Sequence, residues 1–111
     1  MATIANLYID AGTSYNNLIT VTSNAGAVID LTDYTVKAQM RKSYGSSQYF
    51  DFDASVYNPT QGKIKLAMVH TLTNTIPPGR WLYDVEITSI EGTRTRVIEG
   101  IVIVTPQITQ T

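Results

Sequence analysis

The chain has 111 residues, a formal net charge of -1, a charged fraction of 15% and no cysteine. A chain of this length builds one hydrophobic core, so we expect a single domain that spans residues 1–111. The missing cysteines exclude a disulfide framework, a thiolate metal site and a cysteine nucleophile. The charged fraction is low against about 25% in typical soluble domains. We therefore expect neither nucleic acid nor an anionic membrane as a partner.

The N-terminal segment lacks the basic region and the apolar core of a signal peptide. No apolar run in the chain approaches the roughly 18 residues of a membrane span. We expect a protein that is made in a cytoplasm and is soluble there.

The first half of the chain contains several segments that are typical of β-strands. Residues 4–9 form a brief strand that ends in turn residues. Residues 18–22 form the next strand, and residues 28–31 extend its pairing after a turn signal of Asn and Gly. Residues 34–41 then alternate between apolar and polar side chains, which predicts a central strand with one buried face. The inward residues of this strand are Tyr34, Val36, Ala38 and Met40.

The second half begins with two more strands. Residues 49–53 form a strand whose Phe50 and Phe52 share a face, and residues 63–69 form another after a turn. The stretch that follows ends in Pro-Pro-Gly, which rules out a strand there. A single helical turn at residues 72–76 is possible.

Residues 80–88 and 93–104 are two alternating runs joined by a short turn, which predicts a long antiparallel hairpin. About seven strands, separated by turn signals roughly every 8 to 12 residues, indicate a β-sandwich or a barrel, and we favour the sandwich. The predicted fold class is all-β, an immunoglobulin-like antiparallel β-sandwich of about seven strands. The inward residues of the first hairpin strand are Trp81, Tyr83, Val85 and Ile87.

The pattern Gly79-x-Trp81-x-Tyr83 opens the penultimate strand. Immunoglobulin-like domains carry G-x-Y-x-C at this place, and its tyrosine forms the tyrosine corner. Here Trp81 takes the place of the tyrosine and Tyr83 that of the cysteine.

No group of residues carries a catalytic or metal-binding signature. The only histidine, His70, lies at a strand end without an assignable nucleophile or orienting partner, so a solvated residue is the better interpretation. Asp51 and Asp53 project from one face of their strand, yet two carboxylates supply too few oxygens for a calcium cage. We expect no enzyme activity, no catalytic residues, no metal and no cofactor.

Other charged and aromatic residues have structural interpretations. Arg94 and Arg96 share one face of the last strand, where we expect them to face Asp84 and Glu86 across the hairpin. Several aromatic residues could form a stacking platform for sugar, as in carbohydrate-binding modules, but their inward register favours a core. These aromatic residues are Tyr34, Phe50, Phe52, Trp81 and Tyr83.

The last strand is apolar on both faces after Gly100, a glycine that we expect at a β-bulge. A half-exposed strand would alternate, so something must cover its outer side. Either the N-terminal arm with Ile4 and Leu7 covers it, or a neighbouring subunit does. Tyrosines in loops or at outward positions, including Tyr8 and Tyr49, add contact area. The candidate interface residues are Ile101, Val102, Ile103, Val104, Tyr15, Tyr44 and Tyr57.

Four segments resemble, in order, small immunoglobulin-like proteins and domains of tailed bacteriophage particles. The most specific are G-x-W-x-Y-D-V, which begins at Gly79, and R-V-x-E-G-x-V-x-V-x-P, which begins at Arg96. Similar segments occur at the N-terminus of baseplate upper proteins and in tail or neck components. The resemblance covers most of residues 28–109. The four segments are residues 30–41, 62–66, 78–87 and 96–106.

The resemblance implies a structural protein of the virion, in the tail, baseplate or neck, that acts through protein–protein contacts in particle assembly. The implied partners are other virion proteins and further copies of the chain, as a homo-oligomer within the particle. Such a protein is synthesised in the host cytoplasm and ends in the virion. The alternative is a carbohydrate-binding or host-adhesion β-sandwich module, which would expose aromatic side chains in a groove.

Overall fold

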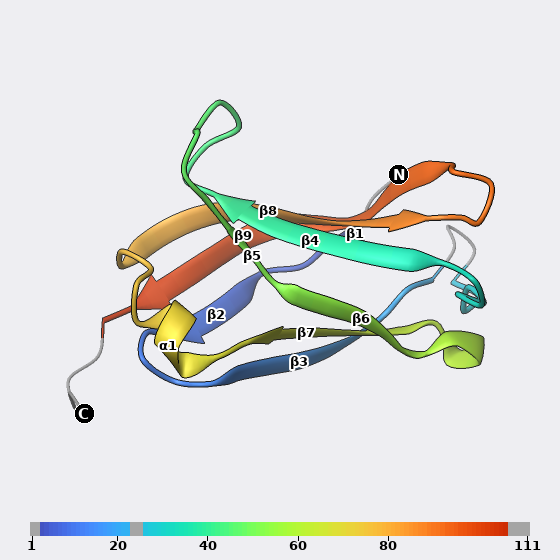
Figure 1. The fold of residues 1–111 in the computed structure, drawn as a ribbon, viewed down its shortest axis with the longest axis horizontal. Coiled ribbons are helices and arrows are strands. Elements are labelled where there is room, and N and C mark those ends of the chain that lie inside the picture. Colours follow the sequence, from blue (N-terminus) through green and yellow to red (C-terminus); the bar gives the residue numbers. More distant parts are fainter. Residues whose placement is uncertain (1–2, 23–25, 107–111) are drawn as a thin grey trace.

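The computed structural model describes residues 3–22 and 26–106, which form two β-sheets packed face to face (Figure 1). The six-stranded sheet contains β1 (Thr3–Ile4), β2 (Leu7–Asp10), β4 (Thr35–Arg41), β5 (Tyr49–Asp51), β8 (Gly79–Thr88) and β9 (Arg94–Thr105). The three-stranded sheet contains β3 (Tyr15–Thr20), β6 (Asp53–Asn58) and β7 (Lys63–Met68). Two short helical turns, η1 (Pro59–Gln61) and α1 (His70–Thr73), connect strands.

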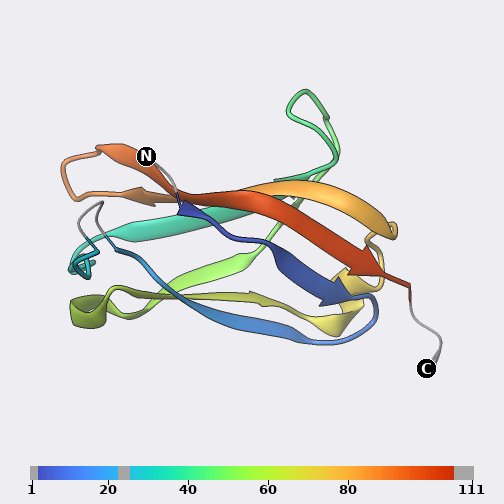
Figure 2. The same ribbon diagram turned by 180° about the vertical axis from the view of Figure 1, so that it is seen from behind.

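The strand order is that of an immunoglobulin-like sandwich. In the three-stranded sheet, β3, β7 and β6 take the places of strands B, E and D. In the six-stranded sheet, β4, β8 and β9 take those of strands C, F and G. Neighbouring strands run antiparallel, except that β1 and β2 lie parallel to β9. Figure 2 shows β2 (blue) and β9 (red) side by side and pointing the same way. The predicted fold class is confirmed.

The strands differ from the predicted ones at several places. The strand predicted at residues 4–9 is divided into β1 and β2, and β6 has no predicted counterpart. Residues 28–31 form no strand, because only Val28 makes a bridge, to Thr22. The helical turn predicted at residues 72–76 begins two residues earlier, as α1.

The chain changes sheets at Phe52, in the middle of the strand predicted at residues 49–53. Asp51 ends β5 and pairs with β4 in the six-stranded sheet, whereas Asp53 begins β6 and pairs with β7 in the other sheet. The Phe52 ring is buried between the sheets. The prediction that the two aspartates share one strand face is therefore wrong, and no paired-carboxylate site arises from them.

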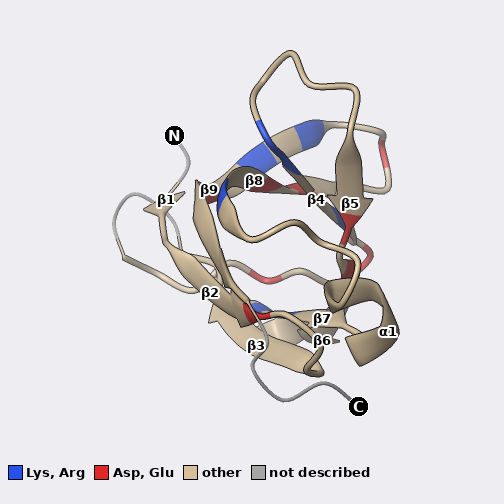
Figure 3. Ribbon diagram, turned by 90° about the vertical axis from the view of Figure 1, so that its left-hand side faces the viewer, with Lys and Arg blue, Asp and Glu red and all other residues tan. Residues whose placement is uncertain are grey.

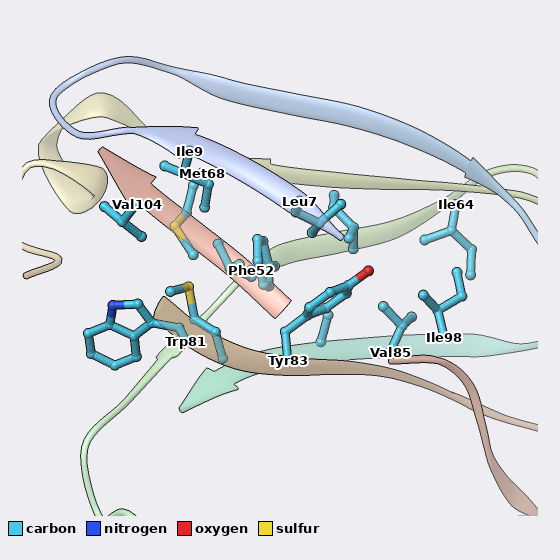
Figure 4. Packing of buried hydrophobic residues seen from close by; sticks show 14 of the residues in the cluster. Leu7, Ile9, Phe52, Ile64, Met68, Trp81, Tyr83, Val85, Ile98 and Val104 are labelled. Carbon is cyan, nitrogen blue, oxygen red and sulfur yellow. The ribbon is translucent and has the colours of Figure 1, made fainter. Parts of the chain in front are cut away.

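One cluster of buried side chains fills the space between the sheets (Figure 4). In β8 every second side chain from Trp81 to Ile87 is buried, which confirms the predicted alternation. Strand β7 supplies Ile64, Leu66 and Met68 from the opposite sheet. The alternation thus separates the side chains that hold the fold from those that face outward.

Trp81 closes the core beside the loop that precedes β8. Its indole nitrogen donates a 3.0 Å hydrogen bond to the carbonyl oxygen of Pro77, four residues upstream. The ring of Phe50 packs against it edge-on, with 5.5 Å between the ring centroids. This geometry is that of a tyrosine corner with an indole in place of the phenol, as the Gly79-x-Trp81 pattern predicts.

The bulge of the β8–β9 hairpin lies at Val97 and not at Gly100. The register shifts between Val85 and Glu86 of β8, which leaves Val97 without a partner, whereas Tyr83 and Gly100 are regular partners. The predicted bulge at Gly100 is therefore wrong.

Gly100 instead makes room for a contact across β9. A Cβ atom at this position would collide with the carbonyl group of Ala5. Without that atom, the Tyr83 ring passes over β9, and its hydroxyl donates a 2.5 Å hydrogen bond to the Ala5 carbonyl oxygen. The backbone nitrogen of Ala5 also donates to the Glu99 carbonyl oxygen, at 2.9 Å. Together these bonds attach the link between β1 and β2 to the core.

Truncation of Trp81 tests the core. Trp81 is 1% exposed, and Trp81→Ala should lower the free energy of unfolding by roughly 3 to 5 kcal/mol, because it leaves a large cavity. The matched control is Leu82→Ala on the outer face, which should cost roughly 1 kcal/mol. Denaturant unfolding of both variants measures the difference, and equal costs would contradict the burial of Trp81.

The Tyr83 phenol should make stability depend on alkaline pH. Burial is the main cause that raises the pKa of Tyr83 from 10.0 to about 12, and the neighbouring Tyr15 adds to it. The folded pKa is higher than the unfolded one, so the protonated phenol of Tyr83 contributes to the free energy of unfolding. This contribution is complete below the unfolded pKa of 10.0 and is lost as the pH rises towards 12.

Tyr83→Phe should therefore be less stable than the wild type at neutral pH by about 1 to 2 kcal/mol, because the Ala5 carbonyl loses its donor. The difference in the free energy of unfolding between Tyr83→Phe and the wild type should narrow between pH 10 and pH 12, the unfolded and folded pKa values of Tyr83. Urea unfolding over this range measures it, with Tyr44→Phe as the exposed control. A gap that stays constant with pH would contradict the assigned pKa.

Candidate interaction surface

Strand β9 sends its apolar side chains alternately into the core and onto the outer face of the six-stranded sheet. Val102 and Val104 are 0% and 2% exposed, so they are core residues and not the interface residues that the sequence predicts. Ile101 and Ile103 lie on the outer face and are half-buried. The predicted second apolar side of this strand therefore consists of Ile101 and Ile103.

The N-terminal arm lies beside β9 and not over it. In the parallel β2–β9 pair, Leu7 lies opposite Val102 and Tyr8 opposite Ile103. Leu7 is buried in the core, whereas Tyr8 is 70% exposed. The arm extends the sheet by one strand, so the expectation that it covers the outer side of β9 is wrong.

Four apolar side chains form a continuous strip on this outer face, across β2, β9 and β8. Register places Tyr8 opposite Ile103, and Leu82 opposite Ile101. We call Tyr8, Leu82, Ile101 and Ile103 the outer strip. Leu82 is absent from the predicted interface, although it is the one apolar residue among the outward positions of β8. That break in a polar row is the signal that could have identified it.

A shallow hollow of about 480 Å³ adjoins the outer strip. Leu82 and Ile101 form part of its floor, and Ile4 and Tyr44 contribute further apolar surface. Its remaining surface is mainly polar. The polar residues along it are Gln39, Arg41, Ser43, Asp84, Glu86, Arg96 and Glu99.

The charged groups of the hollow neutralise one another in part. Arg96 forms ion pairs with Asp84, at 3.1 Å, and with Glu99, at 3.3 Å. Burial raises the pKa of Asp84, and Glu86 and Glu99 raise it further, while Arg96 acts against them. Figure 3 shows acidic and basic segments close together in this sheet. The predicted pairing across the hairpin is thus confirmed for Arg96.

Arg94, the second predicted partner, lies opposite Thr88 near the hairpin turn. It makes no ion pair with any residue that the structure describes. The predicted charge pairing is therefore limited to Arg96.

Arg41 fixes the loop that rises beside the hollow. Its guanidinium donates to the Ser46 carbonyl oxygen at 2.9 Å and to Gln39 Oε1 at 3.3 Å. The same group lies 4.7 Å from the centroid of the Tyr49 ring. Tyr44, within this loop, is 84% exposed. Arg41 therefore holds the base of the loop in place, and the loop exposes Tyr44 to solvent.

The predicted interface tyrosines do not gather at one site. Tyr44 lies at the hollow with Ile101, whereas Tyr57 is on β6 in the other sheet and is 61% exposed. Tyr15 is half-buried, and its ring packs 6.1 Å from that of Phe52. Tyr15 therefore supports the core and does not have the outward position that the sequence predicts.

Other features have no site around them in the described parts of the chain. His70 is the exposed first residue of α1. Within residues 3–22 and 26–106, no group of three or more His, Cys, Asp or Glu side chains could hold a metal ion. The same residues contain no helix with the length and apolar character that a membrane crossing requires.

Comparisons with known proteins give distant likenesses in structure. No family model matches the chain, and no curated protein matches it. Among solved structures, AggA, the major subunit of aggregative adherence fimbriae type I of Escherichia coli, is similar with a TM-score of 0.44 and 14% identity. The match covers 90% of this chain and 89% of AggA. A likeness at this level does not bear on function.

The two faces of β9 predict opposite results for the same kind of substitution. Val102→Asp places a carboxylate in the core and should cost about 3 kcal/mol or more, because no partner there can pair with it. Ile103→Asp places it on the outer face and should leave the domain folded. Circular dichroism and thermal unfolding measure both variants. Unfolding by Ile103→Asp would contradict the register of β9.

Proposed function

We propose that this protein is a structural component of a tailed-bacteriophage particle, in the tail, baseplate or neck, and that it works through protein–protein contacts. The proposal begins from the resemblance of the patterns at Gly79 and Arg96 to immunoglobulin-like virion proteins. In this proposal the chain is synthesised in the host cytoplasm and is then assembled into the virion. Its partners are other virion proteins and further copies of itself.

The observation that carries the proposal is the outer strip. Tyr8, Leu82, Ile101 and Ile103 place apolar surface on three neighbouring strands, and Ile4 beside them is 73% exposed. Contiguous exposed apolar surface is unfavourable in water and is typical of protein–protein interaction sites. Specific contacts bury roughly 1,000 Å² or more in total, and the strip with the adjoining hollow offers a centre for such a contact.

The polar groups around the strip also favour a contact surface over a reaction centre. Arg96 is held by Asp84 and Glu99, and Gln39 donates a 2.7 Å hydrogen bond to Asp51. These groups bind one another instead of converging on a common point where a substrate atom could react. A rim of polar groups around an apolar centre is the usual anatomy of an interface.

A carbohydrate-binding or host-adhesion module is the second proposal, and it has less support. Trp81, Tyr83 and Phe52 are buried at 1%, 4% and 5% exposure, so they cannot stack on a sugar ring. Exposed tyrosines such as Tyr44, beside the hollow, would have to stack on the sugar instead. Glycan-array binding that Tyr44→Ala abolishes would favour this alternative.

The main test places the folded Ile103→Asp variant in a phage that encodes this chain. Each 1.4 kcal/mol of lost contact energy lowers affinity about tenfold, so incorporation into particles and infectious titre should fall at least about tenfold. The matched control is Ile90→Asp, the same change at a residue that is 80% exposed in the hairpin turn. Mass spectrometry of purified particles measures incorporation. Two results would contradict the proposal: normal assembly and titre with Ile103→Asp, or the finding that purified wild-type particles do not contain this chain.

A further inference from the structure

The edges of the two sheets differ in how they are protected. An edge strand presents unpaired N–H and C=O groups to which another strand can add, and natural proteins block such edges with charges, prolines, bulges or short strands. In this protein the edges are β3 and β6 in the three-stranded sheet, β5 on one side of the six-stranded sheet, and β1 with β2 on the other.

Three of these four edges carry such devices. Strand β6 contains Asp53, has a bulge between Val56 and Asn58 and runs into Pro59. Strand β5 has three residues, one of them Asp51. The edge formed by β1 and β2 is interrupted between its two short strands and ends in a charged residue. Each of these edges is therefore a poor template for a further strand.

Strand β3 has none of these protective features. Its six residues, Tyr15–Thr20, pair without a register shift with β7 and include no charged residue and no proline. Within the described residues, no strand and no backbone hydrogen bond is found on the other side of these six residues. Leu18, on its outer face, is 51% exposed.

We propose that β3 pairs antiparallel with β3 of a second copy of this chain, about a twofold axis at Leu18. The pairing joins two three-stranded sheets into one continuous sheet of both copies. It places Leu18 opposite Leu18 of the second copy and Asn16 opposite Thr20. This contact specifies how the chain meets a further copy of itself, a partner named in the proposed function on which it rests, and it uses the opposite sheet from the outer strip.

The alternation of β3 selects this register. Directly opposite residues in an antiparallel pair lie on the same face, and a slip by one residue would turn the buried side of one copy outward. A register centred on Asn17 preserves the faces but sets Leu18 against Asn16 of the second copy. Only the register centred on Leu18 brings the exposed leucines of the two copies into direct cross-strand contact with each other.

A second copy is the occupant that fits this edge. A twofold pair brings identical strands together, so any charge on the edge would repel its own image. Strand β3 has no charge, and its main-chain groups find matching partners in the same strand of the copy. The outer neighbours of Leu18, Asn16 and Thr20, are both polar and uncharged, and they suit hydrogen bonding across the pair.

A single cysteine tests the register, because the chain has no cysteine of its own. Opposite residues of an antiparallel pair lie about 4.5 to 5.5 Å apart between Cα atoms, within the roughly 4.4 to 6.8 Å that a disulfide spans. Leu18→Cys should therefore form a disulfide-linked dimer under mild oxidation. Asn16→Cys on the same face is the control, since its two copies would lie roughly 13 Å apart along the strands.

The expected result is a dimer band for Leu18→Cys that appears at least about tenfold faster than for Asn16→Cys, because only the first pair meets disulfide geometry. Tyr57→Cys, on the protected β6 edge, should behave like Asn16→Cys. Equal rates for Leu18→Cys and Asn16→Cys would overturn the proposal.

Sedimentation of uncrosslinked protein supplies a second measurement. The wild type should show a dimer fraction that rises with concentration, and Leu18→Lys should be folded and monomeric, because two lysines would face each other at the axis. Tyr57→Lys should sediment like the wild type. A wild type that stays monomeric at its solubility limit would overturn the proposal. The Ile103→Asp result is independent, since that residue lies in the other sheet.

Discussion

The hydrogen bond from the Tyr83 hydroxyl to the Ala5 carbonyl oxygen attaches the N-terminal arm, which comprises β1 and β2, to the central hairpin of the sandwich. Strands β1 and β2 are short, and within the described residues they pair with β9 alone. The bond fixes the link between them, and Leu7 can then enter the core. Tyr83 occupies the position of a disulfide cysteine in antibody-type domains. Its ring also packs 6.2 Å from Phe52, so one side chain ties the arm to both sheets.

The sequence predicts the fold class and the faces of the long strands well, because alternation with period two survives wherever one face is buried and one is solvated. Strand β8 shows this along its whole length, and the Trp81 corner follows from a local pattern with a local cause. Alternation also predicts that Arg96 and Asp84 share the outer face of the hairpin, but their ion pair is a diagonal contact, because the register places Arg96 opposite Glu86 and Asp84 opposite Glu99.

Features that depend on the third dimension are not predictable in this way. The run Ile101–Val104 has no alternation, so only its register with Tyr8 and Leu82 decides which residues face outward. Gly100 suits a bulge and a close approach equally well, and the Ala5 carbonyl decides between them. The change of sheet at Phe52 leaves the apolar–polar alternation of residues 49–53 intact. Phe52 is buried between the sheets, so its apolar character does not reveal that the residues before and after it pair in different sheets.

The parallel pairing of β1 and β2 with β9 has a mechanical consequence. Because the strands run the same way, the start of the arm and the end of β9 lie at opposite ends of the sandwich (Figure 1). A pulling force between these ends acts along the strands and strains all the hydrogen bonds of the arm together, whereas a peeling force would break them one after another. The domain is therefore built to resist tension along its length, and rupture requires the Tyr83–Ala5 contact to yield with the whole arm.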